Sequence, residues 1–257
     1  MAELSSLSRL QELRLAHGGD WLECADDWTD GEAAVRLAAV RRSMACLQCL
    51  TSLHLQRLYP PPLPECLSQL PALEELSLHD CFCLQPNCLA GGDKLKSLTI
   101  SRSVKIDNSP LLLQHLGRMT QLTSLNLHRS CAVYSIDAPP SVFAALTASS
   151  SSLQRLDLSS CLLDDGWPIV FRQAGRRRLT AVTNLKLQGA EPELSVSDIR
   201  KLSLACPNLH TLDLRDALQP KASLLVLTNL AGLTALEISR VTTESAVSSR
   251  FLAQLTF

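Results

Sequence analysis

The chain has 257 residues and a formal net charge of −1 at pH 7, from 24 Lys and Arg against 25 Asp and Glu. This balance provides no overall field of the kind that attracts nucleic acid or an anionic membrane. Hydrophobic residues make up 46% of the chain and aromatic residues only 4%, which predicts an aliphatic core. No apolar stretch approaches the roughly 20 residues of a membrane span, and the first residues do not resemble a signal peptide. We therefore expect a cytoplasmic protein.

A six-residue pattern, LxxLxL, recurs along the whole chain. Its leucines are three and then two residues apart, which fits neither the period of a helix nor that of a strand. We interpret the pattern as a turn that leads into a short strand. Start-to-start spacings run from 19 residues (Leu233 to Leu252) to 40 residues (Leu10 to Leu50). The ten copies begin at Leu10, Leu50, Leu73, Leu95, Leu122, Leu153, Val182, Leu209, Leu233 and Leu252.

Between these strands, apolar residues recur every three or four positions. This period predicts short helices or 3₁₀ turns. They must lie on the convex side of the array, because the chain has to return to the start of the next strand. Two such series are Leu113, Leu116, Met119 and Leu122, and then Leu224, Leu227, Leu230 and Leu233.

In tandem, the ten copies resemble the leucine-rich repeat proteins. The resemblance implies an α/β solenoid, or horseshoe, with short parallel strands on the concave face and helices and 3₁₀ turns on the convex face. The segment LSLACPNLHTLDLRDA (202–217) resembles the cysteine-containing subtype found in substrate receptors of ubiquitin ligases. The segment LPECLSQLPALEELSL (63–78) is similar to the shorter LPxxLxxLxxL subtype. We expect a mixed array of intracellular type.

The domain organisation predicted from this pattern is a single array over residues 1–257, with about nine to ten coils and no second domain. The widest gap between copies predicts an excursion over residues 16–49, which contains three glycines and two tryptophans. Neither end of the array has a polar cap. We expect the chain to be a piece of a longer array, an incomplete gene model, or an array whose ends are covered by a partner.

Of the ten cysteines, those that lie at or just before a strand are interpreted as buried thiols. Cys81 and Cys161 occupy the position that the family gives to Asn or Cys, and Cys206 comes just before a strand. Cys46 and Cys49 form a CxxC without a second pair at zinc spacing, so we expect buried structural thiols there too. No phosphate-binding loop, HExxH or Ser/His/Asp arrangement is present, and we expect neither catalysis nor a metal or cofactor.

The residues on either side of the last two leucines of each copy should point to the concave face, because strand side chains alternate. None of them is aromatic. In the C-terminal half, the middle position of the strand shifts toward acid, which indicates a site for a basic segment of a partner protein. The predicted partner-binding residues on this face are His79, His128, Arg155, Asp157, Lys186, Asp213, Arg215 and Glu237.

Two further groups of basic residues lie outside the strands. The first follows the strand ends at one register, where Asp80 and Asp216 interrupt it, and we interpret it as a row of solvated charges: Arg57, Arg102, Arg129 and Arg240. The second is an alternative binding loop for an acidic segment or phosphate, formed by Arg172, Arg176, Arg177 and Arg178.

The resemblance implies a non-catalytic scaffold that binds another protein through the concave face. Nucleic acid is not expected, because the face lacks stacking aromatics and a basic stripe. One alternative is the substrate-receptor arm of a ubiquitin ligase, which would need an F-box that this chain does not show. A second alternative is a GTPase-activating regulator, which would need a catalytic residue near the N-terminal rim such as Arg14. The resemblance also leaves open a cytoskeletal, ciliary or nuclear location.

Overall fold

The computed structural model describes residues 7–16, 46–57, 67–81, 89–102, 115–130, 132–133, 152–163, 179–219 and 224–239. The coil predicted from Leu252 lies outside these residues, as does nearly all of the excursion predicted over 16–49.

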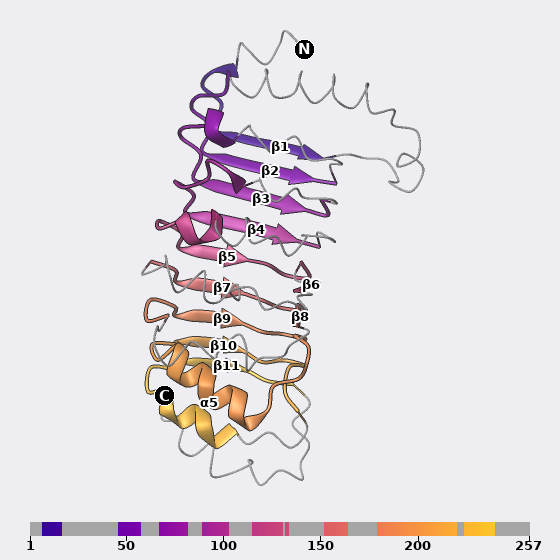
Figure 1. The fold of residues 1–257 in the computed structure, drawn as a ribbon, viewed down its shortest axis with the longest axis vertical. Helices are drawn as coiled ribbons and strands as arrows, with labels where there is room; N and C mark the ends of the chain where they lie inside the picture. The colour runs from indigo at the N-terminus through magenta and orange to yellow at the C-terminus, as the bar shows by residue number, and fades with distance from the viewer. Residues whose placement is uncertain are drawn as a thin grey trace, which may run out of the picture.

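Nine parallel strands form one open sheet, and their order in the sheet is their order in the chain. Figure 1 shows them stacked one after another along the long axis of the molecule. The first four strands have five residues: β1 Glu12–Ala16, β2 Ser52–Gln56, β3 Glu75–His79 and β4 Ser97–Ser101. The next five have three: β5 Ser124–Asn126, β7 Arg155–Asp157, β9 Asn184–Lys186, β10 Thr211–Asp213 and β11 Ala235–Glu237. The leucine-rich repeat solenoid predicted from the sequence is confirmed.

Short helical elements connect these strands. The 3₁₀ helix η3 covers Leu67–Gln69, η5 covers Leu224–Asn229, and a single helical turn covers residues 115–118. The longest helix of the described residues is α5, Val196–Ala205, which begins with a capping box between Ser195 and Asp198. A second, two-stranded parallel sheet joins β6, Ala132–Val133, to β8, Leu162–Leu163. No described helix is long and apolar enough to span a bilayer.

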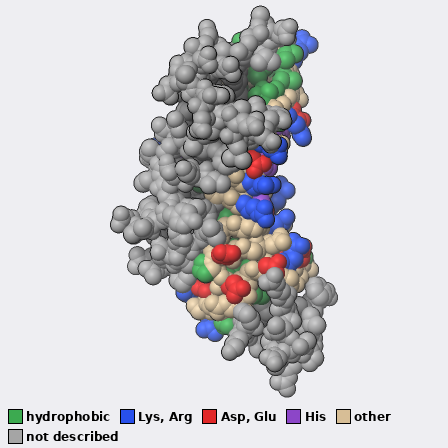
Figure 2. Space-filling model, turned by 90° about the vertical axis from the view of Figure 1, so that its right-hand side faces the viewer, with side chains coloured by type: hydrophobic (Ala, Val, Ile, Leu, Met, Phe, Trp, Pro, Cys, Tyr) green, Lys and Arg blue, Asp and Glu red, His purple; other side chains and the backbone are tan. Residues whose placement is uncertain are grey.

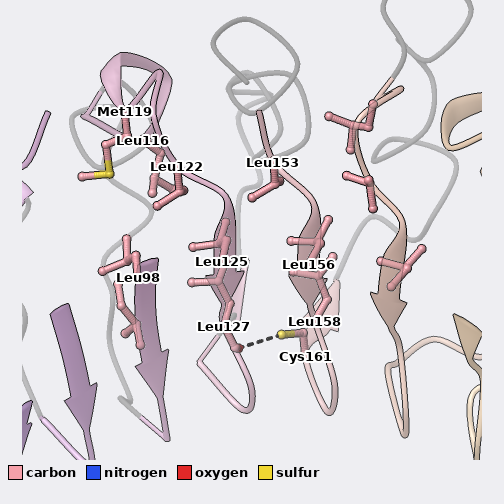
Figure 3. Packing of buried hydrophobic residues seen from close by; sticks show 14 of the residues in the cluster. Leu98, Leu116, Met119, Leu122, Leu125, Leu127, Leu153, Leu156, Leu158 and Cys161 are labelled. Carbon is pink, nitrogen blue, oxygen red and sulfur yellow. Dashed lines mark hydrogen bonds between the residues drawn. The ribbon is translucent and has the colours of Figure 1, made fainter. Parts of the chain in front are cut away.

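Two leucine columns run through the core from coil to coil. Strand pairing places Leu98, Leu125 and Leu156 at one register, so each packs on the next (Figure 3). All three are almost fully buried. The second column, which includes Leu55, Leu78 and Ile100, is buried in the same way. Burying one such side chain stabilises the fold by about 1.5–3 kcal/mol. The core is aliphatic along the described coils, as the composition predicted.

The chain makes the same turn after successive strands. One residue of the turn has a φ of +50° to +59° in seven coils, although only one of the seven is a glycine. Its backbone N–H donates to the following coil, as from Arg57 to the His79 carbonyl and from Arg129 to the Ser159 carbonyl. These bonds extend the coil-to-coil ladder past the strands. The seven residues are Arg57, Asp80, Arg102, Arg129, Ser160, Gly189 and Asp216.

Side chains at the Asn/Cys position of the repeat close the gap to the preceding coil. The Cys161 thiol donates to the Leu127 carbonyl at 3.1 Å (Figure 3), and the Ser130 hydroxyl donates to the Ile100 carbonyl at 2.7 Å. Cys81 makes the equivalent contact with the Leu55 carbonyl at 3.7 Å. The predicted burial of Cys81, Cys161 and Cys206 is confirmed.

The prediction that Cys46 and Cys49 are buried is wrong. Both cysteines are exposed, on the turn that leads into β2. Leu47 and Leu50 are fully buried and take the core positions of this turn. Because the two buried leucines are three residues apart in this turn, the residues just before them face solvent.

Candidate protein-binding surface

The concave side of the nine strands presents polar side chains in columns. Strand pairing aligns the first residue of each strand with the first of the next. The third residues align in the same way, and we call them the middle column. These residues alternate with buried leucines, as in β2 and β4. The first column is Glu12, Ser52, Glu75, Ser97, Ser124, Arg155, Asn184, Thr211 and Ala235; the middle column is Arg14, His54, Ser77, Thr99, Asn126, Asp157, Lys186, Asp213 and Glu237.

At the N-terminal end of this face, charged groups are paired with near neighbours. Arg14 Nε donates to Glu12 Oε1 at 2.5 Å. His54 Nε2 lies 2.9 Å from Ser52 Oγ, and Ser52 in turn donates to Glu75 Oε2 at 3.3 Å. Arg14 is the residue that a GTPase-activating role would need, and its guanidinium is committed to a glutamate of its own strand.

His79 is held between two strands by hydroxyl groups. Its Nε2 lies 2.8 Å from Ser77 Oγ, and its Nδ1 is hydrogen bonded to Ser101 Oγ. Burial lowers the pKa of His79, Asp80 opposes this shift, and the charge of His54 adds to it. Because Ser77 and Ser101 each bond one ring nitrogen, both nitrogens of His79 are hydrogen bonded within the fold. The neighbouring Cys81 thiol points to the Leu55 and His79 carbonyls.

At the C-terminal end, Arg215 joins two acidic residues of the predicted site. Its guanidinium is bidentate to Asp213, with Nη2 2.7 Å from Oδ2 and Nε 3.0 Å from Oδ1, and its Nε lies 3.1 Å from Glu237 Oε2. Asp213 is only 3% exposed. Burial raises the pKa of the Asp213 carboxyl, but the hydrogen bonds and charge of Arg215, with the charge of Lys186, outweigh it, so that the net pKa lies below its ordinary value. One guanidinium thus serves two carboxylates at this end, and Glu237 remains exposed.

Asp157 and His128 have structural roles in addition to their predicted one. Asp157 Oδ1 accepts the Ser159 N–H at 2.9 Å, and Asn126 Oδ1 accepts the His128 N–H at the same distance. Lys186 is exposed and lies between Asp157 and Asp213 in the middle column. The acidic column predicted from the sequence therefore exists as a register, but a lysine interrupts it.

The basic residues predicted outside the strands divide into two groups. Arg57, Arg102 and Arg129 are exposed at the ends of β2, β4 and β5, and Arg102 Nε lies 3.1 Å from Asp80 Oδ1. The others lie outside the described residues: Arg172, Arg176, Arg177, Arg178 and Arg240.

Among the described residues, no group of three or more His, Cys, Asp or Glu side chains is placed to hold a metal ion. What the surface offers is hydrogen-bond donors and acceptors across many coils. Sequence reasoning found the columns but missed the Asp213–Arg215 pair. A signal was present, since residues two apart on a strand share a face and Asp213 and Arg215 have opposite charges.

The fold belongs to the class of leucine-rich repeat proteins, and comparison with solved structures agrees. TLR13, in its complex with ssRNA13, has a TM-score of 0.52 at 18% identity over 92% of this chain and 33% of that chain. An internalin from Listeria monocytogenes scores 0.46 at 19% identity, over 82% of this chain and 69% of that one. A leucine-rich repeat protein of Leptospira interrogans scores 0.45 at 18% identity, over 88% and 54%. No family model and no curated protein matches the sequence.

Proposed function

We propose that this protein is a non-catalytic scaffold that binds another protein through the concave face of β1 to β11. The observation that carries the proposal is the unbroken register of nine strands, which aligns polar side chains over the whole face. A partner segment lying across the strands would meet a new side chain about every 4.8 Å. The fold fits this role because it supplies a long surface and, in the part described, no metal-binding cluster.

The composition of the face favours recognition by hydrogen bonds and charge. Apart from Ala235, its columns hold Ser, Thr, Asn, His and charged residues, so the large Phe, Tyr and Trp anchors of many tight interfaces are missing. The residues proposed to contact the partner are His79, His128, Arg155, Asp157, Lys186, Asp213, Arg215 and Glu237. Asp213 would act mainly by positioning Arg215, because its own oxygens are already bonded.

The proposed location is a reducing compartment such as the cytoplasm. Cys81, Cys161 and Cys206 are buried without a disulfide, and burial raises the pKa of the Cys206 thiol to about 12. Thiols of this kind are compatible with an intracellular protein.

Photo-crosslinking from defined positions tests the binding face. A benzophenone amino acid would replace Arg155 or Lys186, which are exposed on the concave columns, and as a matched control Arg200, which is exposed on α5. We expect the two concave positions to capture a common partner from a cell extract and the α5 position not to capture it. Capture from Arg200 alone, or equally from all three positions, would contradict the proposal.

A further inference from the structure

Resting on the proposed function, we propose that the middle of the concave face, over β4, β5 and β7, binds an acidic segment of the partner protein. We call this region the central donor surface and define it by Ser97, Thr99, Ser124 and Arg155 on the strands, with Arg129 on the rim just past β5. The three hydroxyls and two guanidinium groups can all donate hydrogen bonds, and none of the five side chains carries negative charge. The chemistry that matches them is a run of carboxylates and carbonyl oxygens.

The hydroxyls of this surface are uncommitted within the described residues. Ser97 and Ser124 are adjacent in the first column, and Thr99 lies beside Asn126 in the middle column. All three hydroxyl residues are partly exposed, and none has a side-chain hydrogen bond there. By contrast, Ser52 and Ser77, in the two preceding coils, are bonded to histidines of their own strands. The central hydroxyls are therefore left for a ligand.

The two arginines are also without an ion pair in the described part of the chain. Arg155 follows Ser124 in the first column, and Arg129 ends the coil of β5. The backbone of Arg129 is fixed by a φ of +53° and by its N–H bond to the Ser159 carbonyl at 3.0 Å. Arg14, Arg102 and Arg215 differ, because each pairs with an acid.

Acids as well as bases adjoin this surface, but the acids are hydrogen bonded within the fold. On the rim toward which the strands point, Lys and Arg side chains gather near the middle, with Asp and Glu mainly below them (Figure 2). Two acids are next in register. Glu75, beside Ser97, accepts the Ser52 hydroxyl at 3.3 Å, and Asp157, beside Asn126, accepts the Ser159 N–H at 2.9 Å. Asp80 is held by Arg102 at 3.1 Å. An acidic segment would thus be attracted here and repelled from the β10–β11 end, where Glu237 is exposed.

A protein segment fits this surface better than RNA. Proteins that bind single strands stack successive bases on aromatic side chains, and the described concave columns have none. Hydroxyls at the strand spacing suit instead the carbonyls and carboxylates of an extended peptide.

The test is fluorescence anisotropy with the full chain and labelled probes of equal length: a Glu/Ser peptide, a Lys/Ser peptide and oligouridylate RNA. The variants are Arg129→Glu and Arg155→Glu, with Arg200→Glu on α5 as the control of equal charge change. We expect the Glu/Ser peptide to bind best, Arg129→Glu and Arg155→Glu each to weaken its binding about tenfold, and Arg200→Glu to change its Kd less than about twofold. Added salt should weaken the wild-type complex, because the contacts are exposed charges.

The proposal is overturned if the Lys/Ser peptide or the RNA binds as tightly as the Glu/Ser peptide, or if Arg200→Glu weakens binding as much as Arg129→Glu and Arg155→Glu. Circular dichroism of each variant confirms that exposed substitutions leave the fold unchanged. Failure here with crosslinking still confined to Arg155 and Lys186 would remove only the acidic partner. Failure of both experiments would remove the concave scaffold as well.

Discussion

The coils of β1 to β4 and the coils of β5 to β11 have the same core but differ in strand length. The first four strands have five residues and the later five have three, although the leucine columns continue without interruption. The change in strand length coincides with a change of residue type in the middle column. It holds Arg14, His54, Ser77 and Thr99 in the first region, and Asn126, Asp157, Lys186, Asp213 and Glu237 in the second.

An Asn or Asp at the middle position captures a backbone group that would otherwise extend the strand. The side-chain oxygens of Asn126, Asp157 and Asp213 accept the N–H two residues further on, at 2.9, 2.9 and 3.1 Å. This is the local bond that Asx residues form in competition with sheet ladders. In a parallel ladder that N–H would donate to the preceding strand.

The carbonyl left without this donor is bonded in another way. Ser130 and Cys161, at the Asn/Cys position of their coils, donate to the Ile100 and Leu127 carbonyls. The comparison teaches that side chains of the concave face, and not the leucine core, decide where β5, β7 and β10 end. β9 and β11 have Lys186 and Glu237 instead of an Asx residue, and both pair with an Asx-containing strand.

The largest effect is expected at Asp213, where the second region combines the Asx bond with a charge pair. Asp213→Ala removes the acceptor of the Arg215 N–H and of its guanidinium, and should lower the free energy of unfolding by about 2–3 kcal/mol. Asp213→Asn keeps a side-chain oxygen for the N–H and should cost less. Urea unfolding measures both. Equal losses for the two variants would show that the charge pair, and not the Asx bond, carries the effect.

A smaller effect is expected where the two regions meet. Asn126→Ala removes the acceptor of the His128 N–H and should cost about 1 kcal/mol. In the reverse direction, Thr99→Asn would bring an acceptor to the middle of β4 and should shorten that strand. Amide hydrogen exchange at residues 101 and 128 reports both changes. Lys186→Ala is the control, since Lys186 cannot accept such a bond, and a comparable change in that variant would refute the explanation.

The architecture was predictable because the repeat pattern specifies which residues are buried. Leucines three and then two apart can all be buried only in a turn followed by a short strand, and ten copies leave few alternatives to a solenoid. The same logic placed Cys81 and Cys161 in the core. It failed for Cys46 and Cys49, where the pattern gave no register and Leu47 and Leu50 took the buried positions.

The candidate site was predictable as a set of columns but not as a set of partners. Strand alternation alone identifies Asp157, Asp213 and Glu237 as neighbours in one column. Which of them is neutralised depends on the rotamer of Arg215, and which hydroxyls are bonded depends on the histidines nearby. Such choices are set by three-dimensional contacts and leave no periodic signal in the sequence.

The smallest expected effect concerns how the two regions respond to acid. Because burial lowers the pKa of His79 below its ordinary value of 6.5, the unfolded chain takes up a proton at this residue before the folded chain does. Stability contributed by neutral His79 is therefore present above about pH 6.5 and is lost as the pH falls from there through the lower folded pKa. Asp213 responds later, because its pKa is lowered from 3.8: its contribution is present above that value and is lost below it.

Urea midpoints measured over a pH series separate the two responses. His79→Gln should flatten the dependence just below pH 6.5 and leave the limb below pH 3.8 unchanged, whereas Asp213→Asn should do the opposite. NMR titration of the His79 ring should show a midpoint below 6.5. A midpoint at or above that value would mean that Asp80 outweighs burial at His79. The hydroxyls of Ser77 and Ser101 would then favour the charged His79 ring, and the coils of β1 to β4 would gain stability in acid instead of losing it.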